Sequence, residues 1–242
     1  MLSDYKLTIR CVNIGLPMDV SLPDHPPSNK RRYGGVLPEE RQRLRRAKLV
    51  EGAIEVFGTK GFHGATVREV CVAAHLTERY FYESFKTLPQ LFLAAYSELR
   101  EQLMALTLAA MEQVPRSNDP LEMLAPAMRV FLVFIRDDPR RGRIMLVDSL
   151  AVSDEVAAMS GATARDYSAL LKQHLTRLLP PERLDGISLP LLADGMIGLN
   201  VLLAARWMQD GFAEPIDKVV RTNLLPYQGL MHLAKHNSTA TG

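Results

Sequence analysis

Side chains suited to reading a nucleic acid are concentrated in residues 66–85. The planar guanidinium of Arg79 matches the O6 and N7 acceptors of guanine, and the carboxylate of Glu78 can accept from the N4 amino group of cytosine. Tyr80 offers an apolar surface to the methyl group of thymine. For Arg79 and Tyr80 the alternative is a solvated side chain or contact with phosphate alone, and Glu78 can instead repel wrong placements. The predicted chemistry is hydrogen bonding to base edges.

Neighbouring residues are suited to hold the phosphates on either side of such a contact. Thr66 and Thr77 each stand where a helix is expected to begin, so their hydroxyls and the nearby backbone amides can donate to phosphate oxygens. Tyr82 and Lys86 are placed to clamp the phosphates that flank the groove, and Arg68 is placed to reach the nucleic-acid backbone. Contacts of this kind position a protein on a duplex without reading its sequence.

Two short helices joined by a tight turn must carry these side chains. Thr66 and Glu69 have the spacing of a capping box, in which each side chain accepts from the other residue's backbone amide. Thr77 can cap the second helix, whose Phe81 and Phe85 form an inward-facing i,i+4 pair. A helix-turn-helix places the first turn of its second helix in the major groove. The inward face of the first helix is predicted to consist of Val67, Val70, Cys71 and Ala74.

This motif, with Leu49–Phe57 and the Lys60-Gly61-Phe62 segment before it, resembles the DNA-binding domain of the tetracycline-repressor (TetR) family. The resemblance is specific over residues 41–96 and continues beyond them only as a helical layout. The family usually has Gly where His75 stands, at a turn that requires a left-handed backbone. Histidine tolerates that conformation at some cost, so we expect His75 to lower the stability of the domain.

The charge of the chain is unevenly distributed, although its net charge is only +2. Basic residues beside a DNA-reading element neutralise phosphates and release counterions, and we expect at least one of Arg41, Arg45 and Arg46 to do so. The alternative is a solvated helix face. Arg31 and Arg32 could also form an arm that follows the minor groove. The whole cluster is Lys30, Arg31, Arg32, Arg41, Arg43, Arg45, Arg46 and Lys48.

The fold is predicted to be all-α: a three-helix DNA-binding domain with the helix-turn-helix, followed by a larger helical ligand-binding and dimerisation domain. We expect a flexible N-terminal extension in 1–38, the DNA-binding domain in 39–87, the second domain in 88–236 and a disordered tail in 237–242. With 242 residues, 47% of them hydrophobic, the chain can bury such cores. Helices are expected at 39–59, 88–113, 120–137, 140–149, 154–179, 189–210 and 215–235.

The second domain is rich in methionine, whose unbranched side chain adapts to apolar shapes. The family resemblance implies an apolar effector pocket here, although each residue on its own is more often simple core. Asn200 is either a satisfied interface group or a ligand contact. The candidate pocket residues are Met104, Met128, Phe131, Met145, Tyr167, Met196 and Asn200.

A homodimer is predicted, because one short recognition helix makes few contacts and a two-fold axis sets two of them about 34–36 Å apart, one turn of DNA. The last two long helices would form the interface, where small residues allow close approach. An effector would shift the helix that follows residue 87 and so change the spacing of the recognition helices. The interface candidates are Gly195, Gly198, Leu199 and Leu202.

The resulting hypothesis is a DNA-binding transcriptional regulator, most simply a repressor released from operator DNA by a small apolar effector. No metal site, nucleophile motif or phosphate loop is found, so no enzyme, metal or cofactor is expected. The apolar stretch 189–207 contains Asp194, Asn200 and Arg206, which predicts a buried helix and a cytoplasmic protein without a membrane span. The alternative is a helical small-molecule-binding protein that does not regulate DNA.

Overall fold

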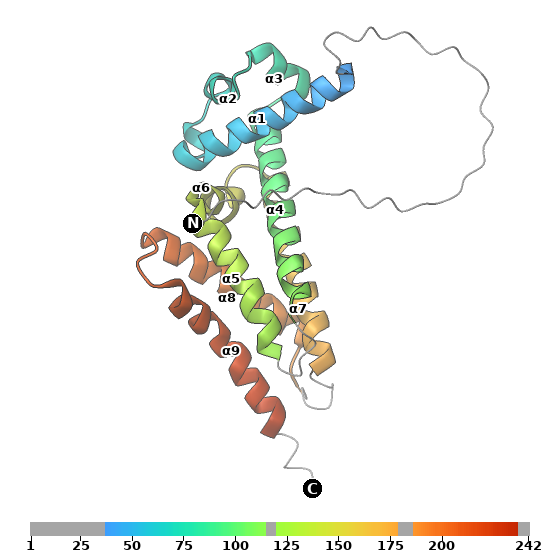
Figure 1. Cartoon of the computed structure of the whole chain (residues 1–242), viewed down its shortest axis with the longest axis vertical. Helices are drawn as coiled ribbons and strands as arrows, with labels where there is room; N and C mark the ends of the chain where they lie inside the picture. The colour runs from blue at the N-terminus through green and yellow to red at the C-terminus, as the bar shows by residue number, and fades with distance from the viewer. Residues whose placement is uncertain (1–36, 115–119, 179–185, 237–242) are drawn as a thin grey trace, which may run out of the picture. The chain divides into compact units, whose positions relative to one another are not determined.

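Helices are the regular elements of the residues that this computed structural model describes, which are 37–114, 120–178 and 186–236 (Figure 1). The all-α prediction is confirmed for these residues. The predicted N-terminal extension up to residue 36, including Arg31 and Arg32, and the tail 237–242 lie outside them. From Glu39 onward the described chain forms one compact unit, so the predicted division at residue 87 stays a prediction.

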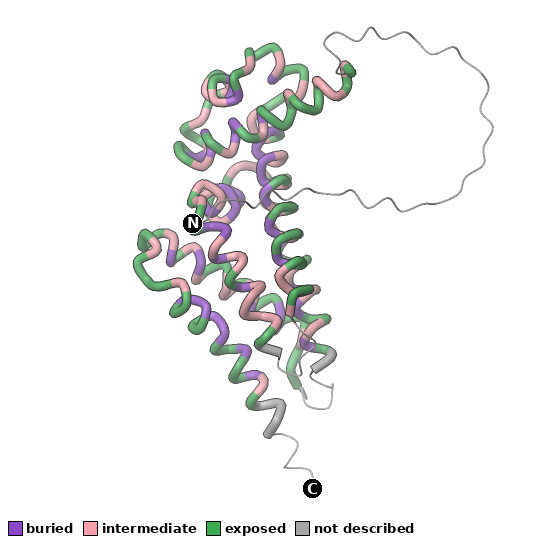
Figure 2. The backbone as a smooth tube through the Cα atoms, in the orientation of Figure 1, coloured by how far each residue is buried: buried purple, intermediate pink, exposed green. Residues whose placement is uncertain are grey.

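The three-helix part consists of α1 (Pro38–Lys60), α2 (Val67–Ala73) and α3 (Glu78–Ser84), with a short 3-10 turn, η1 (Phe62–Gly64), after α1. Aromatic rings hold α1 to the chain that follows: the Phe57 ring centroid lies 5.7 Å from that of Phe62 and 5.2 Å from that of Phe92. Figure 2 shows buried positions on the faces that these helices turn toward one another. Packing of this core fixes the two motif helices against α1.

In the three-helix part, two backbone positions carry positive φ angles, Gly61 and His75. His75 has φ 53°, so the predicted left-handed turn between α2 and α3 is confirmed at a residue that is not glycine. Gly61 ends α1 with φ 80° and ψ 165°, which is outside the left-handed helical region. A Cβ on Gly61 would lie 2.5 Å from Nη2 of Arg143. Glycine is therefore favoured there by its backbone conformation, since the flexible end of the Arg143 side chain could move aside for a Cβ.

Helix α4 (Leu88–Glu112) joins the three-helix part to the rest of the chain (Figure 1). The Thr87 hydroxyl accepts from the Gln90 amide at 3.3 Å. The Gln90 side chain accepts from the amide of Lys86 at 2.9 Å. This arrangement is similar to a capping box shifted by one residue, and it satisfies an amide that precedes the helix.

The remaining helices form a bundle in which α4 packs against α5 and α7, α8 packs against α7, and α9 packs against α5. The helix predicted at 140–149 is instead a sequence of three short turns that includes a π-helical turn. Single π-helical turns frequently occur at functional sites. The elements are α5 (Pro120–Asp137), α6 (Pro139–Gly142), η2 (Arg143–Val147, the π-helical turn), η3 (Asp148–Leu150, a 3-10 turn), α7 (Asp154–Leu178), α8 (Leu189–Gln209) and α9 (Ile216–His236).

Helix α8 buries only one of its faces in a single chain, which corrects the prediction of a buried helix. Its buried residues are Ala193, Met196, Ala204 and Trp207, whereas Leu191 is 71% exposed and Leu202 is 66% exposed. By length and composition alone, α8 is the one helix of the described residues that could cross a membrane. Its charged Asp194 and Arg206 argue against a span, and its apolar face is left to be covered by another surface.

Candidate nucleic-acid interface and ligand cavity

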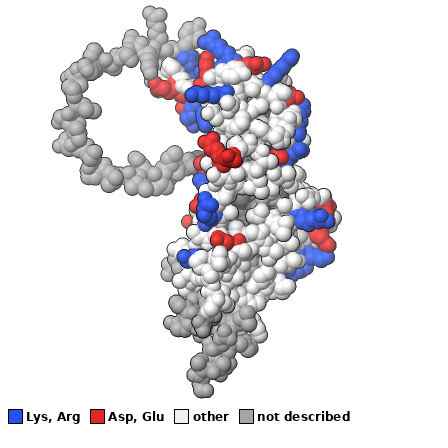
Figure 3. All heavy atoms as spheres, turned by 180° about the vertical axis from the view of Figure 1, so that it is seen from behind, with Lys and Arg blue, Asp and Glu red and all other residues white. Residues whose placement is uncertain are grey.

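The recognition helix α3 keeps its polar side chains at the surface because its two phenylalanines are buried. Phe81 is fully buried and Phe85 nearly so, whereas Tyr82 is 61% exposed. Thr77, Glu78, Arg79 and Lys86 are exposed as well. Lys and Arg side chains, with some acidic ones among them, gather over this three-helix part in the space-filling view (Figure 3). The predicted reading face of α3 is thus accessible.

A network that the sequence did not reveal holds the predicted base-reading residues. The Glu83 carboxylate accepts from Nε of Arg79 at 3.0 Å and lies 3.8 Å from Nη2 of Arg45 on α1. The Arg45 guanidinium in turn lies 4.5 Å from the centroid of the Tyr80 ring. The i,i+4 spacing of Arg79 and Glu83 could have signalled the first pair. The contacts to Arg45 join two helices, and no local pattern reports them.

This network leaves Arg79 available for DNA. Its side chain is 84% exposed, and exposed ion pairs of this kind contribute about 0–1 kcal/mol. Arg79 can therefore exchange Glu83 for a base edge at little cost. Tyr80 is only half-buried, but Arg45 covers its ring. Arg45 acts first on Tyr80, by positioning it, and its predicted phosphate contact has to compete with that role.

The two threonines that begin the motif helices differ in whether their hydroxyl groups are already used in helix capping. The predicted capping box at α2 is present, and the Thr66 hydroxyl also donates to Oε2 of Glu69 at 2.9 Å. Lys60 lies 2.5 Å from the same carboxylate, and its hydrogen bond, followed by that of Thr66, lowers the pKa of Glu69. Thr77 is the N-cap of α3 but makes no side-chain capping bond, contrary to prediction. Thr77 is thus the better phosphate donor.

The other predicted phosphate contacts lie on the same part of the chain. Arg46 is exposed on α1, and its guanidinium lies 4.3 Å from the centroid of the Phe85 ring. Arg68 is exposed near the start of α2, and Arg41 is half-buried on α1. These residues surround α3 from α1 and α2, so one duplex lying across α3 could meet several of them.

An apolar cavity of about 370 Å³ lies among α4, α5, α7, α8 and α9. Five of the seven predicted pocket residues line it, namely Met128, Phe131, Met145, Tyr167 and Asn200. Its volume falls at the lower end of the roughly 300–1,000 Å³ typical of small-molecule sites. The further lining residues that sequence reasoning missed include Leu103, Thr107, Met111, Ile197 and Tyr227.

Met104 and Met196 do not line this cavity, and helical phase explains why. The lining positions on α4 include Leu103, Thr107 and Met111, which recur every four residues on one face. Met104 is rotated about 100° away from that face. On α8 the lining residues are 197, 200 and 201, and Met196 is buried in the core beside them. The methionine-rich composition suggested a pocket, but it did not show which methionine side chains point into the cavity.

Several polar side chains line the cavity, among them those of Asn200, Tyr167 and Tyr227. Asn200 donates from Nδ2 to the Tyr227 hydroxyl at 2.9 Å, while its Oδ1 is buried and has no partner among the described residues. The buried Tyr167 hydroxyl likewise has none. Its neighbour Thr107 donates instead to the carbonyl oxygen of Leu103 at 2.8 Å. Burial raises the pKa values of Tyr167 and Tyr227, so both phenols are neutral at physiological pH.

The wall of the cavity that faces the three-helix part is directly bonded to it. Residues 145, 146, 149 and 150 line the cavity. In the same segment, Oδ2 of Asp148 accepts from the backbone amide of Phe62 at 3.0 Å, and Nη1 of Arg143 donates to the carbonyl oxygen of Thr59 at 3.0 Å. These two hydrogen bonds connect the wall of the cavity to the C-terminal end of α1.

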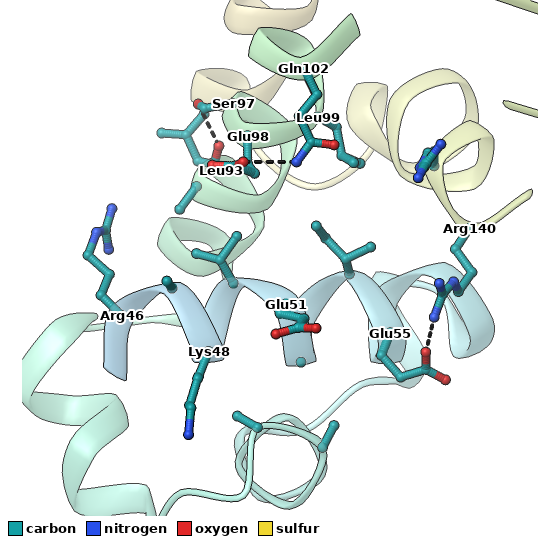
Figure 4. A pocket seen from close by; sticks show the side chains of 18 of the residues that line it. Arg46, Lys48, Glu51, Glu55, Leu93, Ser97, Glu98, Leu99, Gln102 and Arg140 are labelled. Atoms are coloured by element: carbon teal, nitrogen blue, oxygen red, sulfur yellow. Dashed lines mark hydrogen bonds and ion pairs between the residues drawn. The ribbon is translucent and has the colours of Figure 1, made fainter. Parts of the chain in front are cut away.

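Helix α6 makes a second set of contacts with α1. Arg140 donates to Glu55 of α1, and a Cβ on Gly58 would lie 2.2 Å from the Cβ of Arg140 (Figure 4). Arg140 also binds Asp138, and this hydrogen bond lowers the pKa of the Asp138 carboxyl against the opposing effect of burial. Close approach at Gly58 and these ion pairs join α6 to α1.

A larger hollow of about 1060 Å³ lies along α1 and α4. Figure 4 shows the charged and polar side chains around it, among them Arg46, Lys48, Glu51 and Glu98. Because these walls are charged and exposed, we interpret the hollow as a solvated groove rather than a site for an apolar molecule.

The predicted interface residues lie on the open face of α8. Gly195, Gly198 and Leu202 are exposed, and Leu199 is half-buried. No described atom lies within 4 Å of a Cβ placed on Gly195, Gly198 or Gly229 of α9. Small residues and exposed leucines on two adjacent helices form a surface that suits close packing against another helix pair.

Comparison with known proteins gives agreement in sequence and in fold. Residues 49–95 match the model of the family described as bacterial regulatory proteins, tetR family. The chain is similar to the HTH-type transcriptional activator FasR of Mycolicibacterium smegmatis, with 24% identity over 210 residues that make up 86% of this chain and 91% of that protein.

Solved structures share the helical fold along most of the chain. A tetR-family transcriptional regulator from Streptomyces coelicolor superposes with a TM-score of 0.66 and 20% identity, covering 81% of this chain and 83% of that one. The regulator FadR from Bacillus subtilis in complex with stearoyl-CoA superposes with a TM-score of 0.63 and 14% identity, covering 78% and 97%. At these identities the likeness concerns the fold alone.

Proposed function

We propose that this protein is a homodimeric cytoplasmic repressor, which a small apolar effector releases from its operator. The premise is that the chain belongs to the tetR family of bacterial regulatory proteins and is a transcriptional regulator. The observation that carries this proposal is the segment Arg143–Leu150, which lines the cavity and hydrogen-bonds to the end of α1. One element thus touches both the candidate effector and the DNA-reading part.

On DNA, α3 would lie in the major groove with Arg79 on a base edge and Thr77, Tyr82 and Lys86 on phosphates. The exposure of these side chains supports this placement. Arg45 holds Tyr80 in place before DNA arrives, which reduces the side-chain ordering that binding requires.

The dimer would form through the open faces of α8 and α9. The exposed Leu191, Leu202 and Leu225, with the unobstructed glycines 195, 198 and 229, support this assignment. An apolar surface of this kind is usually covered in the working protein. Two copies related by a two-fold axis then present two α3 helices to successive turns of the operator.

An effector in the cavity would act by pushing the wall at residues 145–150. Asp148 and Arg143 move with that wall and displace the end of α1, and with it α3. Such coupling between two sites is typically about 1–3 kcal/mol, and it is reciprocal. DNA must therefore weaken effector binding by the same factor by which the effector weakens DNA binding.

The effector is expected to differ from the acyl-CoA that occupies B. subtilis FadR. Coenzyme A carries several phosphates, which need cationic partners. None of the described residues that line the present cavity is Lys or Arg. A smaller molecule without such a group suits the cavity better.

A linkage titration tests the proposal. Compounds that bind the free protein are titrated against it by calorimetry with and without saturating operator DNA, and the operator is titrated with and without the compound. We expect both affinities to fall by the same factor, about 5–150-fold. An effector whose affinity is unchanged by operator DNA would contradict release, and tighter DNA binding in its presence would indicate an effector-dependent activator instead.

A further inference from the structure

The cavity carries two buried polar atoms that no described residue satisfies, the Oδ1 of Asn200 and the hydroxyl of Tyr167. Leaving a buried polar group without a hydrogen bond is unfavourable, and native structures contain few such groups. The Asn200 amide donates from Nδ2 to the Tyr227 hydroxyl, and Oδ1 is the end of the amide that has no partner among the residues that the structure describes. Its acceptor oxygen is thus available to a donor that enters the cavity.

The cavity provides no formal charge to balance an ionised ligand. None of the described lining residues is Asp, Glu, Lys or Arg, and only His174 among them could become a cation. Transferring an isolated ion into apolar surroundings is far more costly than burying an unpaired hydroxyl. The cavity thus selects against ionised molecules more strongly than against neutral polar ones.

The apolar wall is adaptable in shape. Met111, Met128 and Met145 line the cavity together with Phe131, and thioethers fit irregular or aromatic surfaces. Leu150 lines it as well and is 71% exposed, which places it at the mouth. A molecule can enter past this residue without a buried charge on its way.

We propose that the ligand of this cavity is an uncharged, mainly apolar or aromatic molecule with a hydroxyl or amide group that donates to Oδ1 of Asn200, and that the Tyr167 hydroxyl is a second polar anchor. This inference names the chemical class of the effector and so rests on the proposed function. Its test requires no DNA, however, so the two can fail separately.

The charge preference is tested with a matched pair of fluorescent probes, N-phenyl-1-naphthylamine and its anionic 8-sulfonate. We expect the neutral probe to bind the full-length protein saturably and at least about tenfold more tightly than the sulfonate. Equal or tighter binding of the sulfonate, or the lack of saturable binding of the neutral probe, overturns the proposal.

The polar anchors are tested by displacing the neutral probe with 4-phenylphenol and with biphenyl, which differ by one hydroxyl. We expect 4-phenylphenol to compete about fivefold better, as one net hydrogen bond allows. Asn200→Leu should remove most of this difference, Tyr167→Phe should remove a smaller part of it, and Met104→Leu, at a methionine outside the cavity, should keep it in full. Thermal unfolding verifies that each variant is folded.

The contrary results are equally distinct. No preference for the phenol in the wild-type protein, or a preference that persists in full in Asn200→Leu, overturns the assignment of Asn200 and leaves its oxygen to ordered water. If the phenol binds as expected and DNA affinity does not respond to it, the cavity chemistry stands and the proposed regulation by this ligand does not.

Discussion

At the scale of single residues, local chemistry was predictable and contacts between helices were not. The capping box of Thr66 and Glu69, the buried Cys71 and the left-handed His75 follow from patterns within a few residues. The link from Glu83 through Arg45 to Tyr80 joins residues almost 40 positions apart, and it depends on how α1 packs on α3. Tertiary packing, which no local propensity encodes, decides that arrangement.

The backbone conformation of His75 has a predictable effect on the stability of the protein. Its φ of 53° is strained for a side chain with a Cβ. We expect His75→Gly to raise the free energy of unfolding by about 0.5–1 kcal/mol, because relief of strain exceeds the added entropy of the unfolded chain. Thermal unfolding should then shift upward by about 1–3 °C. Gly61→Ala is the opposite control and should destabilise, and a less stable His75→Gly protein would contradict this account.

At the scale of elements, the helices begin and end within a few residues of their predicted bounds, because prolines, caps and apolar periodicity mark them. The π-helical turn Arg143–Val147 was not predicted. Arg143 of this turn is hydrogen-bonded to α1, whereas Met145 and Leu146 line the cavity. These tertiary contacts cannot be predicted from the local sequence pattern. The same holds for the phase of α4 and α8, which directs Met104 and Met196 away from the cavity.

The hydrogen bond from the Phe62 amide to Asp148 should carry coupling between the cavity and α1. Asp148→Ala leaves that amide without its partner, so we expect a loss of stability of about 1–2 kcal/mol. The loss of DNA affinity caused by a bound effector should shrink as well, in the same linkage titration.

Asp166→Ala is the matched control, because Asp166 also forms an interhelical ion pair, with Arg100, but does not contact α1. It should retain the full coupling. Equal coupling in Asp148→Ala and the wild-type protein would show that the signal travels through α4 instead.

At the scale of the whole molecule, the sequence indicated the helical layout and the general place of the cavity, since five of its predicted residues line it. It indicated the small and apolar residues of α8 but not that one face would be left open. Whether a helix is buried by its own chain or by a second copy depends on the packing of the entire bundle. The exposed apolar face of α8 is thus the structural feature that most directly indicates a binding partner.

Dimerisation through this face predicts the effect of Leu202→Glu. Two carboxylates placed near the two-fold axis would repel one another and lose apolar contact. We expect the variant to sediment as a folded 27.0 kDa monomer, with DNA affinity reduced at least about tenfold. Leu108→Glu, at an exposed leucine of α4, should remain dimeric. A monomeric wild-type protein, or a dimeric Leu202→Glu protein, would contradict this interface.

The central claim is that α3 reads DNA, and binding to the promoter region next to the protein's own gene tests it most directly. Fluorescence anisotropy across a salt series would compare this DNA with a scrambled sequence of equal length. The variants are Arg79→Ala and Tyr82→Phe, with Arg136→Ala on α5 as a control that likewise loses an exposed, ion-paired arginine.

We expect selective binding with a steep salt dependence. Arg79→Ala should weaken it by about 1–3 kcal/mol and reduce selectivity, Tyr82→Phe should weaken it uniformly, and Arg136→Ala should leave it unchanged. Selective binding that survives both α3 substitutions would contradict the assignment of the recognition helix, and binding equal to that of scrambled DNA would contradict the proposed operator.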